Sequence, residues 1–144
     1  MKNGIATDVG ITTDTGITLG YATRGNRLLG QCVDGLIAGA PVFLIAMLSA
    51  VSPVFGLLLI PAFVWVAFYL IFADGLHGGQ SLAKQWLGMR VVDVKTGKPC
   101  TYRQSFIRNI LLSILGPIDW IFIFGERHQR LGDMAADTVV VVAD

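Results

Sequence analysis

The chain has 144 residues, of which 53% are hydrophobic and 15% charged, and its mean hydropathy is +0.64. Soluble domains carry about 25% charged residues, so this composition argues against a soluble domain and for a membrane protein. The net charge of +1 says nothing about nucleic acid, because the placement of the charges matters more than their sum. We expect no nucleic-acid partner. Two cysteines, Cys32 and Cys100, are too few for a disulfide framework, and we expect free thiols. The N-terminus lacks a basic start followed by an apolar run, so we expect no cleaved signal peptide.

Residues 1–20 contain a short repeat in which Gly-Ile heads the units GIATDV, GITTDT and GITLGY. Three imperfect units are too few to bury a β-solenoid core. We therefore interpret residues 1–20 as a Thr- and Gly-rich arm that is either flexible or strand-forming. Residues 21–144 then form the membrane domain.

Two apolar segments predict two transmembrane helices. Residues 28–51 are apolar except for Gln31, Asp34 and a few small polar residues, and residues 54–73 carry no charge. A helix needs about 20 apolar residues to span a bilayer. Ser52-Pro53 separates the segments, so the pattern predicts a helical hairpin.

The basic residues predict the orientation of this hairpin. Nine of the eleven lie before the first span or between Asp74 and Asn109, and the connection at 51–53 has none. Cytoplasmic loops carry an excess of Lys and Arg. We therefore expect a multi-pass protein of the cell membrane, in bacteria the inner membrane, with its N-terminus in the cytoplasm.

The segment after the hairpin predicts a small cytoplasmic β element. SLAKQWLG (81–88) is typical of a short helix at the lipid surface. MRVVDVKTGKPCTY (89–102) indicates a strand, a Thr-Gly turn and a second strand. TVVVVA (138–143) is also a strand, and because an isolated strand is unstable, we expect it to pair with the strand in the 90–102 loop.

A third apolar segment, residues 109–124, is interrupted by Gly116-Pro117. Proline removes a helical hydrogen bond and disfavours helix in the residue before it. The segment is therefore either broken and re-entrant or shallow, returning the tail to the cytoplasmic side, or one Pro-kinked span from Ser105 to Phe124.

Three polar residues share one face of the first span. Arg27, Gln31 and Asp34 follow the spacing i, i+4, i+7. A carboxylate at mid-bilayer costs about 3 kcal/mol or more, so we predict that Asp34 contacts a basic or amide side chain. A relay through Gln31, water or a base such as Arg108 would provide this contact.

Gly35 and Gly39 on the same helix form a small-xxx-small pair beside Gly30, which permits close helix approach. We predict that leucine at Gly35 or Gly39 disrupts helix packing. A chain this small would need to form a homo-oligomer to enclose a pathway.

These residues resemble the RDD family of small integral membrane proteins, named for one arginine and two aspartates. Arg27 and Asp34 match the arginine and aspartate of the first membrane helix. GGQSLAKQWLGMRVVDVKTGKPCTYRQSFIRN is similar to the family's loop pattern, which ends in two arginines, here Arg103 and Arg108.

RLGDMAADTVVV is similar to the family's closing pattern, with Asp133 or Asp119 as the second aspartate. The chain departs from that pattern at Gly132, where the family usually has His, and at Asp137, where it usually has Gly. The first departure weakens a proton-shuttle role there.

The resemblance implies transport of an unidentified ligand, and cation/proton antiport for some members. The residues that would form the transport path, or a satisfied buried polar network that locks the helices, are Arg27, Gln31, Asp34, Arg108, Asp119, Arg130 and Asp133. The alternative is a membrane assembly or lipid-binding module. Expected partners are membrane lipids, a second copy of the chain and a small cation.

An enzyme is not expected, because the sequence has no Gly-rich phosphate loop and no GxSxG motif. His77 and His128 lack metal-ligand spacing. We therefore expect no catalytic residue, metal or cofactor.

Overall fold

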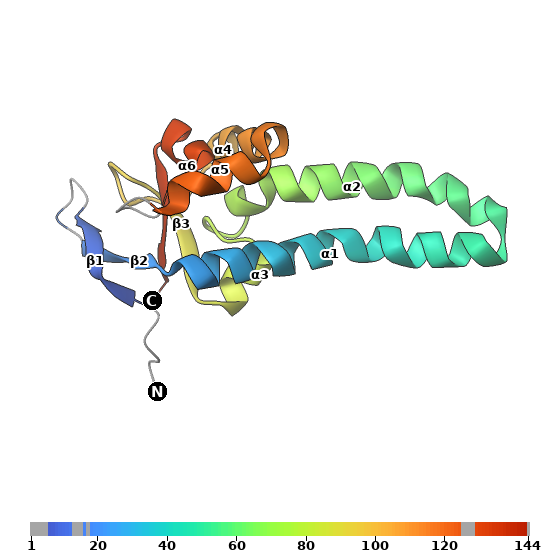
Figure 1. Cartoon of the computed structure of the whole chain (residues 1–144), viewed down its shortest axis with the longest axis horizontal. Helices are drawn as coiled ribbons and strands as arrows, with labels where there is room; N and C mark the ends of the chain where they lie inside the picture. Colours follow the sequence, from blue (N-terminus) through green and yellow to red (C-terminus); the bar gives the residue numbers. More distant parts are fainter. Residues whose placement is uncertain (1–5, 13–15, 17, 125–128, 144) are drawn as a thin grey trace.

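The computed structural model describes residues 6–12, 16, 18–124 and 129–143. A long helical hairpin projects from one end of a small sheet, and the short helices gather where the hairpin meets the sheet (Figure 1). Helix predominates over strand. The predicted helical fold with a small β element is confirmed at this level.

The hairpin contains two helices long and apolar enough to cross a membrane. Its elements are α1 (Arg24–Val51), η1 (Pro53–Leu58), α2 (Leu59–Phe72) and η2 (Ala73–Gly75). The Thr23 hydroxyl starts α1 by accepting a hydrogen bond from the Asn26 amide, as N-cap residues do. Only 11% of the most apolar window of each helix is buried within the chain. A core helix of a soluble protein would be mostly buried, so this exposure fits contact with lipid.

The sheet has four antiparallel strands in the order β1-β2-β4-β3. Their bounds are β1 (Ala6–Thr12), β2 (Thr18–Ala22), β3 (Met89–Asp93) and β4 (Thr138–Val142). Val91 pairs with Val140, so the predicted pairing of the tail with the 90–102 loop is confirmed. Residues 6–12 and 18–20 of the N-terminal arm lie in strands β1 and β2. Residues 1–5, 13–15 and 17 lie outside the described residues.

The predicted second strand of the 89–102 loop is wrong. Residues 94–101 form a turn and an irregular segment, with one isolated bridge between Val92 and Pro99. The Asp93 carboxylate accepts hydrogen bonds from the backbone amides of Lys95 and Thr96 and so fixes the turn. Proline at 99 has no N–H to donate to a ladder. The predicted helix in 81–88 is present as α3 (Leu82–Trp86).

The third apolar segment is broken at the predicted place. Its elements are α4 (Tyr102–Leu115), α5 (Pro117–Ile121) and η3 (Phe122–Phe124), followed by α6 (Leu131–Ala135). A continuous helix from Ser105 to Phe124 is therefore wrong. Gly116, at φ +52°, ends α4 in a conformation that glycine adopts readily. The 14 residues of α4 reach about 21 Å, less than the 30 Å of a hydrocarbon core.

The segment after α5 returns to the end of the molecule where α1 begins. The Arg24 guanidinium donates a hydrogen bond of 3.3 Å to the Phe124 carbonyl and lies 5.4 Å from the centroid of the Phe124 ring. Phe72 of α2 stacks on Phe106 of α4, which places the start of α4 at the same end. Both ends of the third segment therefore lie beside the sheet.

Candidate functional site

A continuous chain of ion pairs lies where α1, α2, α4 and the sheet meet. Its members alternate in sign along Asp34–Lys84–Asp74–Arg108–Asp133–Arg130–Asp119, and Arg27 branches from Asp133. Four basic and four acidic side chains therefore form a neutral set. All are buried except Lys84, whose side chain is 12% exposed. Buried charges are costly unless paired, and the alternation supplies a partner for each charge.

Asp133 on α6 is the centre of this chain. Its carboxylate contacts Arg27 on α1, Arg108 on α4 at 2.8 Å and Arg130 at 3.5 Å. Burial would raise the pKa of the Asp133 carboxyl, but the three guanidiniums outweigh it and hold that pKa well below its usual range. Burial would lower the pKa of Arg108, but the carboxylates of Asp133 and Asp74 outweigh it and raise that pKa. Both groups therefore stay charged at neutral pH.

Arg130 connects α5 to the polar face of α1. Its guanidinium lies 3.7 Å from the Asp119 carboxylate and donates a hydrogen bond of 2.7 Å to the Gln31 amide oxygen. Asp119 also accepts a hydrogen bond of 2.8 Å from the Gly132 amide. Asp119 lies just past the helix break and reaches α1 through Arg130.

Asp34 has four polar partners. The Tyr69 hydroxyl donates to it at 2.9 Å and the Ala83 amide at 3.3 Å, the Ser81 hydroxyl also donates, and the Lys84 ammonium lies 3.7 Å away. The prediction that Asp34 contacts a basic side chain is thus confirmed. Arg108 was suggested as one example of a basic partner for Asp34, and this suggestion is wrong. Arg108 pairs with Asp133 and Asp74 instead.

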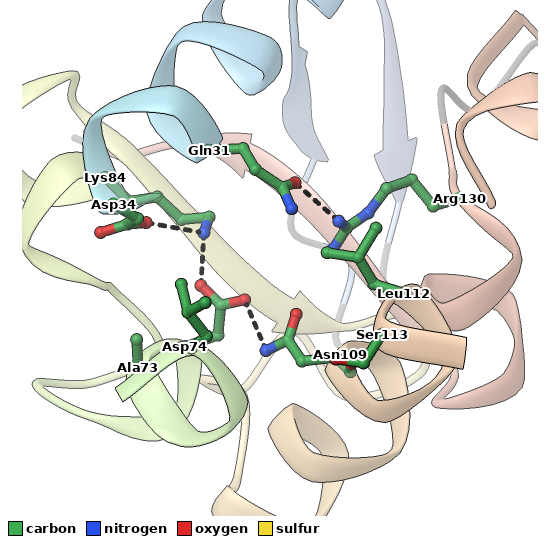
Figure 2. Close-up of a pocket in the computed structure, with 10 residues that line it drawn as sticks. Gln31, Asp34, Ala73, Asp74, Lys84, Asn109, Leu112, Ser113 and Arg130 are labelled. Carbon is green, nitrogen blue, oxygen red and sulfur yellow. Dashed lines mark hydrogen bonds and ion pairs between the residues drawn. The ribbon is translucent and has the colours of Figure 1, made fainter. Parts of the chain in front are cut away.

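The structure adds residues that the sequence analysis missed. Figure 2 shows Lys84 between the carboxylates of Asp34 and Asp74, with the Asn109 amide on the other oxygen of Asp74. The Asn109 nitrogen is 3.3 Å from that oxygen. For Asp74, the sequence feature that could have predicted its place in the network was its position directly after an apolar segment. For Lys84 the sequence offered no such feature, since an amphipathic helix at a membrane surface carries lysines of the same kind.

A cavity of about 80 Å³ opens beside these carboxylates (Figure 2). The residues that line it are Gln31, Asp34, Leu70, Ala73, Asp74, Lys84, Asn109, Leu112, Ser113 and Arg130. This volume holds several water molecules or a small ion with part of its hydration shell. Among the described residues, no group of three His, Cys, Asp or Glu side chains is placed to hold a metal ion.

The two glycines predicted for helix packing have no packing partner in the described part of the chain. A Cβ atom at Gly35 or Gly39 would meet nothing within 4 Å. The close approach occurs one turn earlier, at Gly30, where a Cβ atom would lie 3.1 Å from the Met89 methyl carbon. The role of Gly35 and Gly39 in helix packing, which a contact with a second copy would supply, therefore stays a prediction.

Comparison with known proteins identifies the family of this chain. The model of the RDD family matches residues 21–137. The chain belongs to the RDD family. It is similar to an uncharacterized protein of Haemophilus influenzae, 27% identical over 130 residues that cover 85% of this chain and 79% of the relative. No solved structure matches the chain. Family membership and the two long apolar helices support a membrane protein.

The structure shows the surroundings of Gly132 and the backbone conformation of Asp137, the two residues that depart from the RDD closing pattern. A Cβ atom at Gly132 would lie 2.3 Å from the Arg108 carbonyl oxygen, so here α6 packs against the backbone of α4. Asp137 has φ +51°, a region that glycine enters freely and aspartate tolerates. Of the two candidates for the second family aspartate, Asp133 is the one that contacts Arg27.

Proposed function

We propose that this RDD protein binds a small cation at the cavity between α1, α2 and α4 and exchanges it against a proton across the membrane. One observation carries the proposal: two buried carboxylates on the cavity wall, Asp34 and Asp74, hold a single ammonium, that of Lys84. Intramembrane carboxylates are candidates for ion sites by default.

The exchange follows from charge conservation. The Lys84 ammonium occupies the position between the carboxylates that a bound cation would take. Release of its proton to water frees the carboxylate oxygens that faced the ammonium, and the incoming cation replaces one positive charge with another. Asp74 keeps its contact with Arg108 at 3.7 Å. The neutral balance of the whole network is then kept in both states.

The placement in the membrane belongs to the same proposal. Basic residues gather at the sheet end of the molecule, and the hairpin tip at 51–53 has none. The positive-inside rule then puts the sheet and the N-terminus in the cytoplasm and the tip on the far side of a cell membrane. With both of its ends beside the sheet, the third segment enters the bilayer without crossing it.

Flux measurements test the exchange. The full chain is reconstituted in proteoliposomes with an internal pH dye, and gradients of Li⁺, Na⁺ and K⁺ are applied in turn. We expect cation-dependent proton movement in the wild type and its loss in Asp34→Asn. Asp137→Asn is the matched control, because Asp137 is an exposed aspartate outside the network. Folded wild-type protein that moves no protons with any of these cations contradicts the proposal.

A membrane assembly or lipid-binding module is the second candidate function. Two observations favour it: the charges of the network already balance among themselves, and α3 exposes Trp86 (75%) and Leu82 (38%). Such an apolar pair suits insertion at the level of lipid head groups. Absent flux together with unchanged folding in Asp34→Asn would favour this candidate.

A further inference from the structure

A second, smaller cavity lies between the ion-pair network and the sheet. Its volume is about 10 Å³, and its lining residues are Arg27, Gln31, Lys84, Arg108, Arg130 and Val140. Four of the six are basic, one is an amide and one is apolar. The carboxylates that balance these charges, such as Asp133 and Asp74, do not line the cavity.

The donor atoms of Arg108 are a second sign of a ligand, independent of the charge of the lining residues. The residue is 1% exposed, and its Nη2 atom pairs with Asp133 at 2.8 Å. Its Nε and Nη1 atoms are buried and have no hydrogen-bond partner among the described residues. The Cys100 thiol lies close enough to affect the pKa of Arg108, but a thiol is a weak acceptor. A buried guanidinium with two unpartnered donor nitrogens therefore borders a cavity lined by cations.

We propose that this cavity binds a single small inorganic anion, chloride. A volume near 10 Å³ corresponds to about one water-sized sphere, which excludes phosphate, sulfate and carboxylate ligands. Chloride is somewhat larger than water, and the flexible arginine and lysine side chains accommodate the difference. The sign of the lining residues selects an anion over a cation, and the N–H groups of Arg108 supply donors to it.

The anion site and the cation cavity share three lining residues, Gln31, Lys84 and Arg130. A bound chloride would attract Lys84 away from the carboxylates of Asp34 and Asp74. Anion binding would therefore favour the state in which those carboxylates are open to another cation. The anion site itself does not depend on the proposed cation exchange.

Anion-specific stabilisation tests the proposal. The full chain is purified in detergent with gluconate as the only small anion, and chloride replaces gluconate at constant ionic strength. We expect a saturable rise of the unfolding midpoint, about 5 °C at a chloride concentration ten times Kd. Bromide, which has a similar size, should act like chloride, and sulfate should not. A midpoint that depends on ionic strength alone would show that the cavity holds water only and would overturn the proposal.

Two variants locate the effect. Gln31→Glu keeps an acceptor for Arg130 but adds a negative charge to the cavity wall, so we expect it to abolish the chloride response. Val140→Ile fills the cavity and should do the same. Val139→Ile is the matched control, equally buried in β4 but packed in a different cluster with Tyr21. A full chloride response in Gln31→Glu and Val140→Ile, or its equal loss in Val139→Ile, would refute the site. Because no transport is measured, failure here is distinct from failure of cation exchange.

Discussion

Replacing Asp133 by asparagine tests whether the charge network holds the fold together. The side chains have the same shape, and asparagine still offers an acceptor to the Arg130 amide, which donates to Asp133 at 3.2 Å. The substitution removes the charge shared by three guanidiniums and leaves four basic residues against three acidic ones. Removing one member of a buried ion pair costs about 3–5 kcal/mol, because the remaining charge stays buried without compensation.

A loss of this size is a large part of the 5–15 kcal/mol that typically stabilises a folded protein. Thermal unfolding in detergent, followed by circular dichroism, should show a midpoint about 10–20 °C lower than in the wild type. Asp137→Asn is the control, since the Asp137–Lys95 pair spans 3.2 Å but both side chains are more than 60% exposed. Such pairs contribute about 0–1 kcal/mol, and asparagine tolerates the positive φ of Asp137. Equal effects of the two substitutions, or an Asp133→Asn midpoint within 2 °C of wild type, would refute this account.

Three further predictions concern packing, topology and thiol chemistry. Gly30→Leu should destabilise the fold by about 1–3 kcal/mol through its clash with the sheet, whereas Gly35→Leu should leave unfolding unchanged and lower the oligomer mass if α1 contacts a second copy. In a background without native cysteines, Ser52→Cys and Ala143→Cys should react with an impermeant maleimide from opposite sides of the membrane; labelling from one side contradicts the proposed placement. Burial raises the pKa of the Cys100 thiol to about 11, so about one thiol in a thousand is ionised at pH 8 and native protein should react far more slowly than denatured protein. Equal rates in both would contradict the burial of Cys100.

The sequence predicts those features that follow from local chemistry. The break after Leu115 follows from Gly116-Pro117, and the β4 strand follows from its run of β-branched residues. The requirement for a partner of Asp34 follows from the cost of a buried charge. Each of these depends on a few neighbouring residues, and the structure agrees with each.

The identity of the partners does not follow from local chemistry. Lys84 lies 50 positions after Asp34, and nothing in its neighbourhood distinguishes a buried lysine from one at a lipid surface. The pairing of Asp133 with Arg27 spans 106 positions. Single-sequence patterns report periodicity and not long-range contacts, so the members of the network were predicted better than its connections. At Gly35 the small-xxx-small pattern permits a close contact without specifying a partner, and a Cβ atom there meets no described residue within 4 Å.

The length of α1 argues against a mid-bilayer position for Asp34. Asp34 precedes Val51, the end of α1 at the hairpin tip, by 17 residues or about 26 Å. A hydrocarbon core of about 30 Å that begins at the tip would therefore end near Asp34. In the proposed placement the network lies at the boundary of the core on the side of the sheet, where charged side chains cost less than at the midplane.

Two tryptophans report this depth. Trp86 on α3 lies at the level of the network, because α3 also carries Lys84, the partner of Asp34. Trp65 on α2 is nine residues or about 13 Å from Asp74 toward the tip, so it should lie near the middle of the core. In variants that retain one tryptophan each, lipids brominated near the end of the acyl chain should quench Trp65 strongly and Trp86 weakly. Lipids brominated close to the head group should give the reverse order. Equal quenching profiles for the two tryptophans, or a deeper position for Trp86, would place the network inside the hydrocarbon core. The charge of Asp34 would then carry the full free-energy cost of burial in lipid.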